Sequence, residues 1–503
     1  MLHSISSATG HSLRDLLGNA EIHGAGDVRF CSCTADSQSC QSGDVFVAIA
    51  GSKSDGHDFA AEAVAAGAVA VVAERPLNLS VPTFVVSDTR SALARICQHL
   101  AGQPSRRLRV IGITGTNGKT TTTRLVAAIL NAAGHRAGTL GTLGYCDGDQ
   151  TEPAELTTPS SPALAHWLAR MVANDCTHAV MEVSSHALAQ RRVAGIEFAQ
   201  ACVTNLRRDH LDFHGTLANY HRAKMRLFDQ LRPDGRAIVN ADDALSREHA
   251  PLLPGAVISV GVAYGADLSA TLLERSKSEQ TFLLSWKHLS VPVRTAMIGD
   301  HHVTNCLLAA AIGLAEGIDL MTIVRGLESV DRVPGRLERI ECGQPFGAYV
   351  DFAHTPDALA VSLDTLREVT PGRLICVFGA GGNRDAAKRP LMGHVVESRA
   401  DVTVVTTDNP RFEDPQAIAS EILGGLEKPS EARWIADRTE AIHYALWLAG
   451  PDDTVLIAGR GHETTQQVGD QRLPLDDREV VRSFLYNLAP ASRYGALAGA
   501  APS

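Results

Sequence analysis

The run from Arg109 to Thr121, RVIGITGTNGKTT, carries the clearest chemical signature in the chain. It combines an apolar stretch, a glycine turn and the start of a helix that has Lys119 and Thr120 in its first turn. Backbone N–H groups of such a loop surround an anion, the lysine reaches the outer phosphates, and the threonine hydroxyl can ligate Mg²⁺. The spacing departs from the strict Walker pattern, because Ile113 stands where the first glycine is expected. The apolar positions before and after the turn nevertheless predict a strand and a helix, and with them a nucleoside triphosphate site.

Three further groups have side chains suited to a metal beside a triphosphate. Glu182 ends an apolar stretch, Asp209, His210 and Asp212 follow another, and Lys224 lies in a run with helical spacing. An acidic residue at a strand end is more often a cap or a surface group when it stands alone. Because Mg²⁺ prefers oxygen ligands around a triphosphate, the groups together predict a metal site next to the glycine turn.

Apolar strand candidates alternate with helical patterns through most of the chain, which predicts an α/β fold with parallel sheets. The candidates are Ile111–Thr114, His178–Glu182, Ala201–Asn205, Ala237–Asn240, Ala348–Asp351, Leu374–Phe378, Val402–Thr406 and Thr454–Ala458. Ligands bind beyond the carboxyl ends of such strands. The strand-end residues are Glu182, Asn205, Asp351, Gly379, Asp408 and Gly459.

Two seams, at residues 102–107 and 333–335, divide the chain into three sections of domain size. We expect domains over residues 1–107, 108–333 and 334–503, the first being a smaller mixed α/β domain with a strand that begins at Asp44.

The bulk properties exclude several classes of protein. The 503 residues are 45% hydrophobic and carry a net charge of −10, which argues against binding nucleic acid through a basic face. The longest uncharged apolar run, residues 63–73, is too short to cross a bilayer, and the N-terminus lacks the features of a signal peptide. Ten cysteines without a Cys-x-x-Cys pair favour reduced thiols, so we expect a cytoplasmic protein.

Taken together, the motifs resemble those of the Mur ligases of peptidoglycan synthesis, and the resemblance spans nearly the whole chain. The residues that carry it are GTNGKTT (115–121), EVSSH (182–186), NLRRDHLDFHG (205–215) and Lys224, with DSQ (36–38), GDVFVA (43–48), DFAHTPD (351–357), FGAGGNRD (378–385), KRP (388–390) and GRGHE (459–463) in the outer sections. The resemblance implies a UDP-substrate-binding N-terminal domain, a central P-loop ATPase domain and a Rossmann-like C-terminal domain that binds an amino acid.

The family's reaction activates a carboxylate with ATP as an acyl phosphate, which an incoming amine then displaces. The resemblance implies catalytic roles for Lys119, Lys224, His210 and Glu182, with Mg²⁺ held by Thr120, Glu182, His210 and a carbamate formed on Lys224 from CO₂. A carbamate turns a cation into an anionic ligand, whereas a free ammonium would repel the metal. The alternative is that Lys224 binds phosphate directly. The implied ATP contacts are Gly115, Thr116, Asn117, Gly118, Lys119, Thr120, Thr121, Asn305, Arg336 and Asp351.

The resemblance also implies the other two substrates. The matching positions for UDP-N-acetylmuramoyl-L-alanyl-D-glutamate are Ser37, Ser52, Lys53, Ser54, Thr157, Thr158, Ser184, Gln190 and Arg192, although each serine and threonine alone also fits ordinary turn chemistry. The matching positions for the added amino acid are Arg389, Asp408, Asn409, Pro410, Arg411, Gly459 and Glu463.

The loop Asp408–Arg411 makes meso-diaminopimelate the expected amino acid. Family members that add diaminopimelate carry this tetrapeptide, and those that add lysine usually lack its arginine. Diaminopimelate has a second carboxylate, which the planar fork of an arginine such as Arg411 binds with two hydrogen bonds. The product would be an amide of the D-glutamate γ-carboxylate.

Four residues depart from the family's pattern. Gln38 replaces an arginine, Leu156 replaces an asparagine, and His301 and His302 replace the aromatic residue and the first asparagine of the adenine-side motif. These changes bear on uridine and nucleotide contacts more than on the reaction.

Competing interpretations explain less of the sequence. A Rossmann dehydrogenase needs a glycine at position 384, which is arginine, and a plain P-loop kinase leaves the first section and Asp408–Arg411 without a role. A lysine-adding ligase and a non-catalytic binding protein on the same fold stay as alternatives; the latter would be expected to lose Lys119, Glu182, His210 or Lys224. We expect a monomeric cytoplasmic ligase that binds neither nucleic acid nor membrane.

Overall fold

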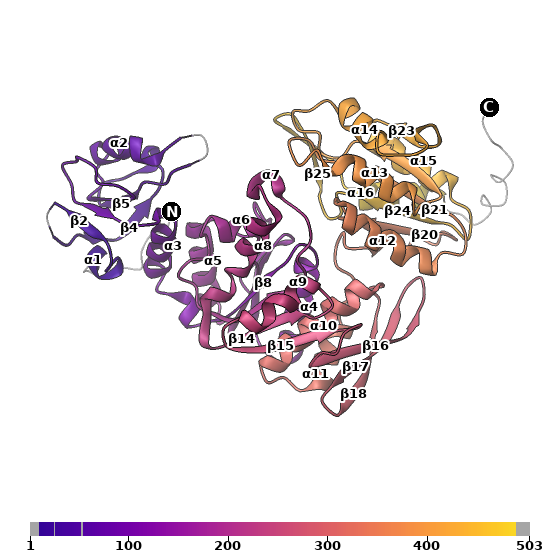
Figure 1. Cartoon of the computed structure of the whole chain (residues 1–503), viewed down its shortest axis with the longest axis horizontal. Coiled ribbons are helices and arrows are strands. Elements are labelled where there is room, and N and C mark those ends of the chain that lie inside the picture. Colours follow the sequence, from indigo (N-terminus) through magenta and orange to yellow (C-terminus); the bar gives the residue numbers. More distant parts are fainter. Residues whose placement is uncertain (1–9, 25, 52–53, 489–503) are drawn as a thin grey trace.

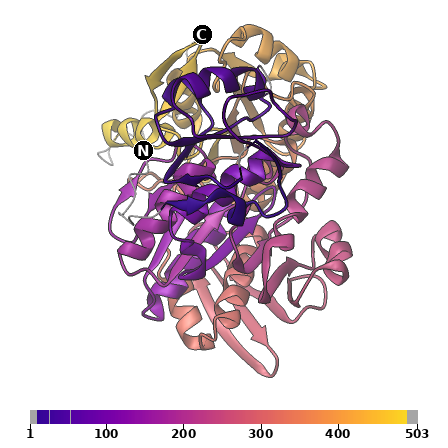
Figure 2. The same ribbon diagram turned by 90° about the vertical axis from the view of Figure 1, so that its left-hand side faces the viewer.

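The computed structural model describes residues 10–24, 26–51 and 54–488. It arranges the chain as three α/β domains, each with its own sheet, following one another from left to right in Figure 1. Seen from the N-terminal side, the first domain lies in front of the other two (Figure 2).

The N-terminal domain is built on a five-stranded sheet of order β2-β7-β6-β5-β4, in which only β2 pairs antiparallel to its neighbour. Its elements are β1 (His11–Ser12), α1 (Leu13–Leu16), β2 (Glu21–His23), β3 (Arg29–Phe30), β4 (Ser32–Thr34), η1 (Ser37–Ser39), β5 (Asp44–Val47), η2 (Gly56–Phe59), α2 (Ala60–Ala65), β6 (Ala70–Ala73), β7 (Thr83–Val85), α3 (Thr89–Leu100) and η3 (Pro104–Arg106).

The middle domain holds an eleven-stranded sheet of order β11-β10-β9-β12-β8-β13-β14-β15-β16-β17-β18. Its elements are β8 (Arg109–Thr114), α4 (Lys119–Ala132), β9 (Ala137–Gly141), β10 (Gly144–Cys146), β11 (Thr151–Glu152), α5 (Ser161–Ala173), β12 (His178–Glu182), α6 (Ser185–Ala189), β13 (Phe198–Val203), α7 (Leu211–His214), α8 (Leu217–Met225), η4 (Phe228–Gln230), β14 (Leu231–Asn240), α9 (Ala244–His249), η5 (Ala250–Leu252), β15 (Ala256–Gly261), β16 (Leu268–Arg275), β17 (Gln280–Trp286), β18 (Leu289–Thr295), α10 (Asp300–Ala315) and α11 (Leu320–Glu328).

Both faces of the central part of this sheet are covered, which explains the continuous apolar runs of the strands there. On one face, side chains such as Ile111, Ile113 and Val180 pack against α4, α10 and α11. On the other, Val110 and Met181 pack against α5 and the residues that follow α6. Because β8, β12, β13 and β14 are parallel neighbours, their carboxyl ends meet at one edge.

The C-terminal domain has a six-stranded sheet of order β19-β20-β24-β21-β22-β23, parallel except for β19. Its elements are β19 (Glu338–Arg339), β20 (Gly347–Asp351), α12 (Pro356–Val369), β21 (Leu374–Phe378), α13 (Lys388–Glu397), β22 (Val402–Thr406), α14 (Pro415–Leu423), η6 (Pro429–Glu431), β23 (Arg433–Ile435), α15 (Arg438–Leu448), β24 (Thr454–Ala458), β25 (Thr465–Val468), β26 (Gln471–Pro474) and α16 (Asp477–Leu488).

The predicted α/β class with three domains is confirmed, while the predicted boundaries after residues 107 and 333 stay a prediction. Four predicted strands, β12, β21, β22 and β24, have the predicted bounds. The strand predicted to end at Asn205 ends at Val203. The antiparallel extension β16–β18 was not predicted, because its alternating pattern contains Pro292 on an edge strand. Within the described ranges, the apolar stretches of the helices are all too short to span a membrane.

The middle and C-terminal domains touch through polar groups at the turn between β16 and β17. Arg275 bonds to Asp300 and, across the interface, to Glu368 of α12. The Tyr349 hydroxyl donates to the Lys277 carbonyl over 2.5 Å. These contacts join the two domains that enclose the cavity described next.

Candidate active site

A cavity of about 700 Å³ lies between the middle and C-terminal domains, at the carboxyl ends of the strands of both sheets. The loops after β8, β12 and β13 line it from one side, and those after β20, β21, β22 and β24 line it from the other. Its volume is that of a site for a small-molecule ligand.

The loop between β8 and α4 forms the floor of the cavity. Gly115 and Gly118 have φ angles of 142° and 86°, and a Cβ would collide with the Thr204 hydroxyl at the first position and with the Asn305 amide at the second. Both glycines are therefore required by the geometry. Asn205 ties the loop down, since its carbonyl accepts from the Thr116 N–H (2.9 Å) and its side-chain oxygen from the Asn117 N–H (3.0 Å).

Lys119 folds back over this loop. Its Nζ donates to the carbonyls of Gly115 (2.8 Å) and Thr116 (3.0 Å), and burial lowers its pKa. Lys224 approaches the same loop from α8: its Nζ donates to the Gly115 carbonyl (2.7 Å) and lies over the Tyr220 ring, 4.5 Å from its centroid. Lys224 is 1% exposed, and this burial holds its pKa well below the usual range.

The buried carboxylate of Glu182 faces the first turn of α4. One oxygen accepts from the Thr120 hydroxyl (3.0 Å) and the Thr142 hydroxyl (3.1 Å), and the other accepts from the Thr142 N–H (2.8 Å). No salt-bridge partner lies within 4 Å of Glu182 in the described part of the chain. A buried anion with hydroxyl neighbours, and with no cation of the described residues within 4 Å, suits an oxygen-ligated metal such as Mg²⁺.

His210 lies at the start of α7 with φ 51° and lines the cavity. Its ring packs edge-on against His186, with centroids 4.7 Å apart, and burial lowers its pKa to about 3. Among the described residues, His, Cys, Asp and Glu side chains do not gather in a group of three or more that could hold a metal. The predicted donor set thus depends on Thr120 and Lys224 as well.

Arg336 connects the C-terminal domain to the nucleotide loop. Its Nη2 donates to the Thr120 hydroxyl (3.2 Å), and its guanidinium lies over the Phe352 ring, 4.3 Å from the centroid. Asp351 lines the same wall, where it accepts from the N–H groups of Leu337 (3.0 Å) and Phe352 (2.8 Å). Residues of both domains therefore meet at the first turn of α4.

The start of α10 supplies the wall beside the nucleotide loop. Asn305 accepts from the Thr122 hydroxyl (3.3 Å), and the partly buried His301 and the buried His302 lie in the same first turn of α10. Both ring nitrogens of His302 and Nδ1 of His301 have no hydrogen-bond partner in the described structure. The departures at these positions therefore place imidazole nitrogens on the cavity wall.

The C-terminal wall gathers charged side chains of both signs. Asp408, Asn409, Arg411, Gly459 and Glu463 all line the cavity. Arg411 has φ 53°, and its Nη1 donates to the Gly382 carbonyl (2.7 Å). Asn409 donates to the Glu463 carboxylate (2.8 Å), whose pKa is raised by burial and by the nearby Asp408.

Arg389, which was predicted to bind the amino acid, and Arg384, for which no role was predicted, differ in their access to the cavity. Arg389, on α13, is 1% exposed and bonds to Glu413 and Glu421, both at 2.9 Å, so it does not reach the cavity. Arg384, in the loop before α13, does line the cavity. Neither Arg384 nor Arg411 has a carboxylate within 4 Å among the described residues. The sequence FGAGGNRD (378–385) contained the signal for Arg384, since this residue follows the end of β21.

The residues predicted for the UDP-linked substrate are divided between two places. Thr157 and Ser184 line the cavity. Thr158, Gln190 and Arg192 form a hydrogen-bonded group behind them, in which Arg192 donates to the Thr158 carbonyl (2.9 Å) and to Gln190 Oε1 (2.7 Å). The carbonyl of the exposed Leu156 accepts from the Tyr145 hydroxyl.

The remaining predicted residues of this set belong to the N-terminal domain. Ser37 and Gln38 are in η1, where the Gln38 N–H donates to Asp36 (3.1 Å), and Ser54 follows β5. Ser52 and Lys53 lie outside the described residues. The cavity does not extend to the described positions of this group.

Of the predicted residues that the structure describes, those on the cavity wall are Thr116, Asn117, Gly118, Lys119, Thr120, Thr121, Thr157, Glu182, Ser184, His210, Asn305, Arg336, Asp351, Asp408, Asn409, Arg411, Gly459 and Glu463. Those away from it are Gly115, Lys224, Ser37, Ser54, Thr158, Gln190, Arg192, Arg389 and Pro410.

Comparison with known proteins identifies the family of this chain. Models of the Mur ligase family match residues 30–103 (catalytic domain), 113–313 (middle domain) and 335–461 (glutamate ligase domain). The chain is 42% identical over 469 residues to the UDP-N-acetylmuramoyl-L-alanyl-D-glutamate–2,6-diaminopimelate ligase of Geobacillus kaustophilus. This alignment covers 92% of this chain and 96% of the relative. This chain belongs to the Mur ligase family.

Two further comparisons agree with this membership. The protein of the same name from Syntrophomonas wolfei is 44% identical over 459 residues, covering 90% of this chain and 93% of the relative. A solved structure of a UDP-N-acetylmuramoyl-L-alanyl-D-glutamate–2,6-diaminopimelate ligase matches with a TM-score of 0.68 at 32% identity, covering 95% of this chain and 99% of that one. The predicted enzyme class, an ATP-dependent ligase, is thereby confirmed.

Besides Arg384, this Mur ligase has cavity residues that sequence reasoning did not assign. Arg207 follows β13, His354 follows β20, and Lys388 begins α13. Each lies in a motif that the resemblance used, so its position near a strand end was the available signal. What the motifs did not reveal is which side chains of a motif point into the cavity.

Proposed function

We propose that this Mur ligase joins meso-diaminopimelate to the D-glutamate γ-carboxylate of UDP-N-acetylmuramoyl-L-alanyl-D-glutamate, using ATP. The observation that carries the proposal is one cavity in which a nucleotide loop faces a wall with a carboxylate pair and two guanidinium groups, neither of which has a carboxylate of the described residues within 4 Å. The first end fits a triphosphate, and the second fits an amino acid with more than one charged group.

The unpaired guanidinium groups favour diaminopimelate over lysine. Arg384 and Arg411 have no carboxylate partner among the described residues, and burial together with the neighbouring Arg384 lowers the pKa of Arg411. An anionic ligand relieves the repulsion between these two cations. Diaminopimelate has two carboxylates and can supply an anion to each guanidinium, whereas lysine has only one carboxylate and would leave one guanidinium without an anionic partner.

In the first step, a carboxylate oxygen of the UDP-linked substrate attacks the γ-phosphorus of ATP, and the bond from that phosphorus to the β–γ bridging oxygen breaks. Lys119, Arg336 and the N–H groups of the loop from Gly115 to Thr121 bind and orient the phosphates, and their charge offsets the charge that develops on the transferred group. ADP leaves, and the substrate carries an acyl phosphate.

In the second step, the amine of diaminopimelate attacks the acyl carbon, the carbon–oxygen bond to phosphate breaks, and the nitrogen loses a proton. Asp408 and Glu463 hold the ammonium and Arg384 and Arg411 hold the carboxylates of the amino acid, so that the reacting amine is oriented. Closing the two domains around the cavity excludes water from the acyl phosphate.

The donor chemistry at the floor of the cavity fits Mg²⁺. Thr120 and the buried Glu182, which has no cationic side chain within 4 Å among the described residues, would hold the ion together with His210 and a carbamate on Lys224. When bound, Mg²⁺ neutralises charge on the phosphates. The carbamate would form when the Lys224 nitrogen bonds to the carbon of CO₂ and releases a proton. The burial of the Lys224 nitrogen beside the Gly115 carbonyl supports this, because no carboxylate of the described residues lies within 4 Å of a charged ammonium at that place.

ATP-dependent phosphate release with the UDP-linked dipeptide tests the function. We expect release with meso-diaminopimelate and none with L-lysine or without an amino acid. Release with lysine alone would overturn the assignment of the amino acid while keeping the ligase. An absence of release with either amine would favour the non-catalytic binding protein.

A further inference from the structure

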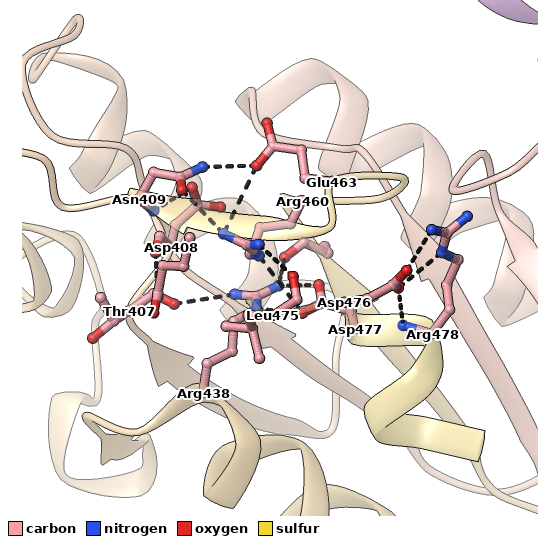
Figure 3. A network of polar contacts seen from close by, with 12 residues as sticks. Thr407, Asp408, Asn409, Arg438, Arg460, Glu463, Leu475, Asp476, Asp477 and Arg478 are labelled. Atoms are coloured by element: carbon pink, nitrogen blue, oxygen red, sulfur yellow. Dashed lines mark hydrogen bonds and ion pairs between the residues drawn. The ribbon is translucent and has the colours of Figure 1, made fainter. Parts of the chain in front are cut away.

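Two arginine side chains and one aspartate form a fully buried layer beneath the wall that carries Asp408 and Asn409 (Figure 3). Arg438 begins α15, Arg460 follows β24, and Asp477 begins α16. All three side chains are 0% exposed. A buried layer of this kind is costly to desolvate, so its charges must be balanced by well-placed partners.

Asp477 is shared unequally between the two arginines. Arg438 binds both carboxylate oxygens, with Nε and Nη2 each at 2.8 Å, and also donates to the Ala458 carbonyl (2.9 Å). Arg460 comes only within 3.7 Å of Asp477, and its Nε has no hydrogen-bond partner in the described structure. One carboxylate therefore faces two guanidinium groups, and Arg460 retains charge that another anion must balance.

That anion is Glu463, on the cavity wall. Arg460 Nη1 lies 3.8 Å from its carboxylate, and the same nitrogen donates to the Asn409 side-chain oxygen over 3.0 Å. Nη2 donates to the Leu475 carbonyl over 2.8 Å, which anchors the fork at its other end. Arg460 thus reaches two cavity residues without lining the cavity itself.

The contact to Asn409 determines which way its amide faces. Its oxygen accepts from Arg460 and from the Gln467 N–H (2.8 Å), so its NH₂ group is left to donate to Glu463 (2.8 Å). Two donors on one side make the reversed amide unfavourable, because it would point an NH₂ group at other donors. The position of the Glu463 carboxylate therefore follows from that of Arg460.

The charge of Arg460 also opposes a repulsion on the wall. Glu463 is partly buried next to Asp408, and both effects raise its pKa, while Asn409, Arg460 and Arg411 lower it. Without Arg460, fewer groups would favour the ionised carboxylate at the place where a cationic group of the ligand is expected.

We infer that Arg460 is a positioning residue for amino-acid binding: its buried guanidinium holds Asn409 and Glu463 in the arrangement that accepts the ammonium group of the incoming amino acid. This inference rests on the proposed function, in which Glu463 binds that ammonium.

Steady-state kinetics of Arg460→Met and Arg460→Lys test the inference, with the KM of meso-diaminopimelate, ATP and the UDP-linked dipeptide measured separately. Loss of a charge-assisted hydrogen bond and of a nearby charge should raise the KM of diaminopimelate about 10- to 100-fold in Arg460→Met. The KM of ATP should change by less than about 2-fold, because the nucleotide loop belongs to the other domain. Arg460→Lys keeps the charge but cannot bond to Asn409 and Leu475 together. Its KM for diaminopimelate should therefore lie between those of the unaltered protein and Arg460→Met, at least about 3-fold above that of the unaltered protein.

Arg373→Met is the matched control. Arg373 bonds to Asp453 (2.7 Å) and the Leu448 carbonyl (2.8 Å) at the opposite end of the same sheet, so its loss should change thermal stability without changing any KM. Equal increases in the KM of ATP and diaminopimelate in Arg460→Met would overturn the inference, as would an unchanged KM for diaminopimelate. If Arg460→Met unfolds at the assay temperature, an unchanged KM in Arg460→Lys overturns it. Failure of the proposed function is distinct, because the unaltered protein would then release no phosphate with diaminopimelate.

Discussion

Arg384 and Arg389 are five residues apart in sequence, and the structure predicts opposite consequences for replacing them. Arg384 lines the cavity, is exposed and has no carboxylate partner in the described structure. Arg389 is 1% exposed and bonds to Glu413 and Glu421. We therefore expect Arg384→Met to weaken amino-acid binding and Arg389→Met to weaken the fold.

The magnitudes follow from the contacts. The partners of Arg389 are themselves 31% and 47% exposed, so each ion pair is partly screened and contributes about 0.5–1.5 kcal/mol. Losing both should lower the free energy of unfolding by about 1–3 kcal/mol, which corresponds to roughly 3–10 °C in Tm for a domain of this size. In the proposed function Arg384 binds a carboxylate of the amino acid, so Arg384→Met should raise the KM of diaminopimelate about 10- to 100-fold and change stability by less than about 0.5 kcal/mol.

The assay pairs thermal unfolding with initial rates of phosphate release at varied diaminopimelate. Each variant is the control for the other, since both remove one arginine from the same segment. The reasoning would be refuted if Arg389→Met raised the KM at an unchanged Tm while Arg384→Met left the KM unaltered. That result would mean that Arg389 leaves its ion pairs when the amino acid binds.

Three further predictions concern the floor, the wall and the sheet. Lys224→Ala should lower kcat by more than about 100-fold with nucleotide binding retained, measured by turnover and ADP titration; near-normal turnover would exclude a carbamate role. Arg411→Asn should raise the KM of diaminopimelate at least about 10-fold more than that of ATP, and equal rises would count against recognition of a carboxylate. Glu316 is buried, which raises its pKa, but bonds from His178, Arg109 and Gln200 prevail and lower it to about 2. Its stabilising effect should be complete above pH 4.5 and fade as pH falls towards 2, so Glu316→Gln should flatten the decline of Tm in that window; an unchanged decline would refute this.

Much of the fold could be predicted because it depends on short-range patterns. The run from Arg109 to Thr121 specifies a strand, a turn and a helix within thirteen positions. Gly115 and Gly118 have the positive φ angles that such a turn requires. Buried parallel strands have continuous apolar runs, so β12, β21, β22 and β24 were found with their bounds. The antiparallel strands β16–β18 were missed, because they are half-exposed and lack that run, and the edge strand β18 also contains Pro292.

The sequence by itself determined which loops carry the chemistry, since the strand ends of a parallel sheet can be located one strand at a time. Only the tertiary structure decided which side chains of those loops reach the cavity. Arg389 belongs to α13 and turns towards Glu421 of α14, while Arg384 precedes the helix and stays on the wall. Asn409 follows β22 and Arg460 follows β24, 51 positions later in the chain, and the two side chains meet only because these strands belong to one sheet. The direction in which a side chain points and the residues that it contacts depend on packing between distant segments, and no local spacing in the sequence encodes them.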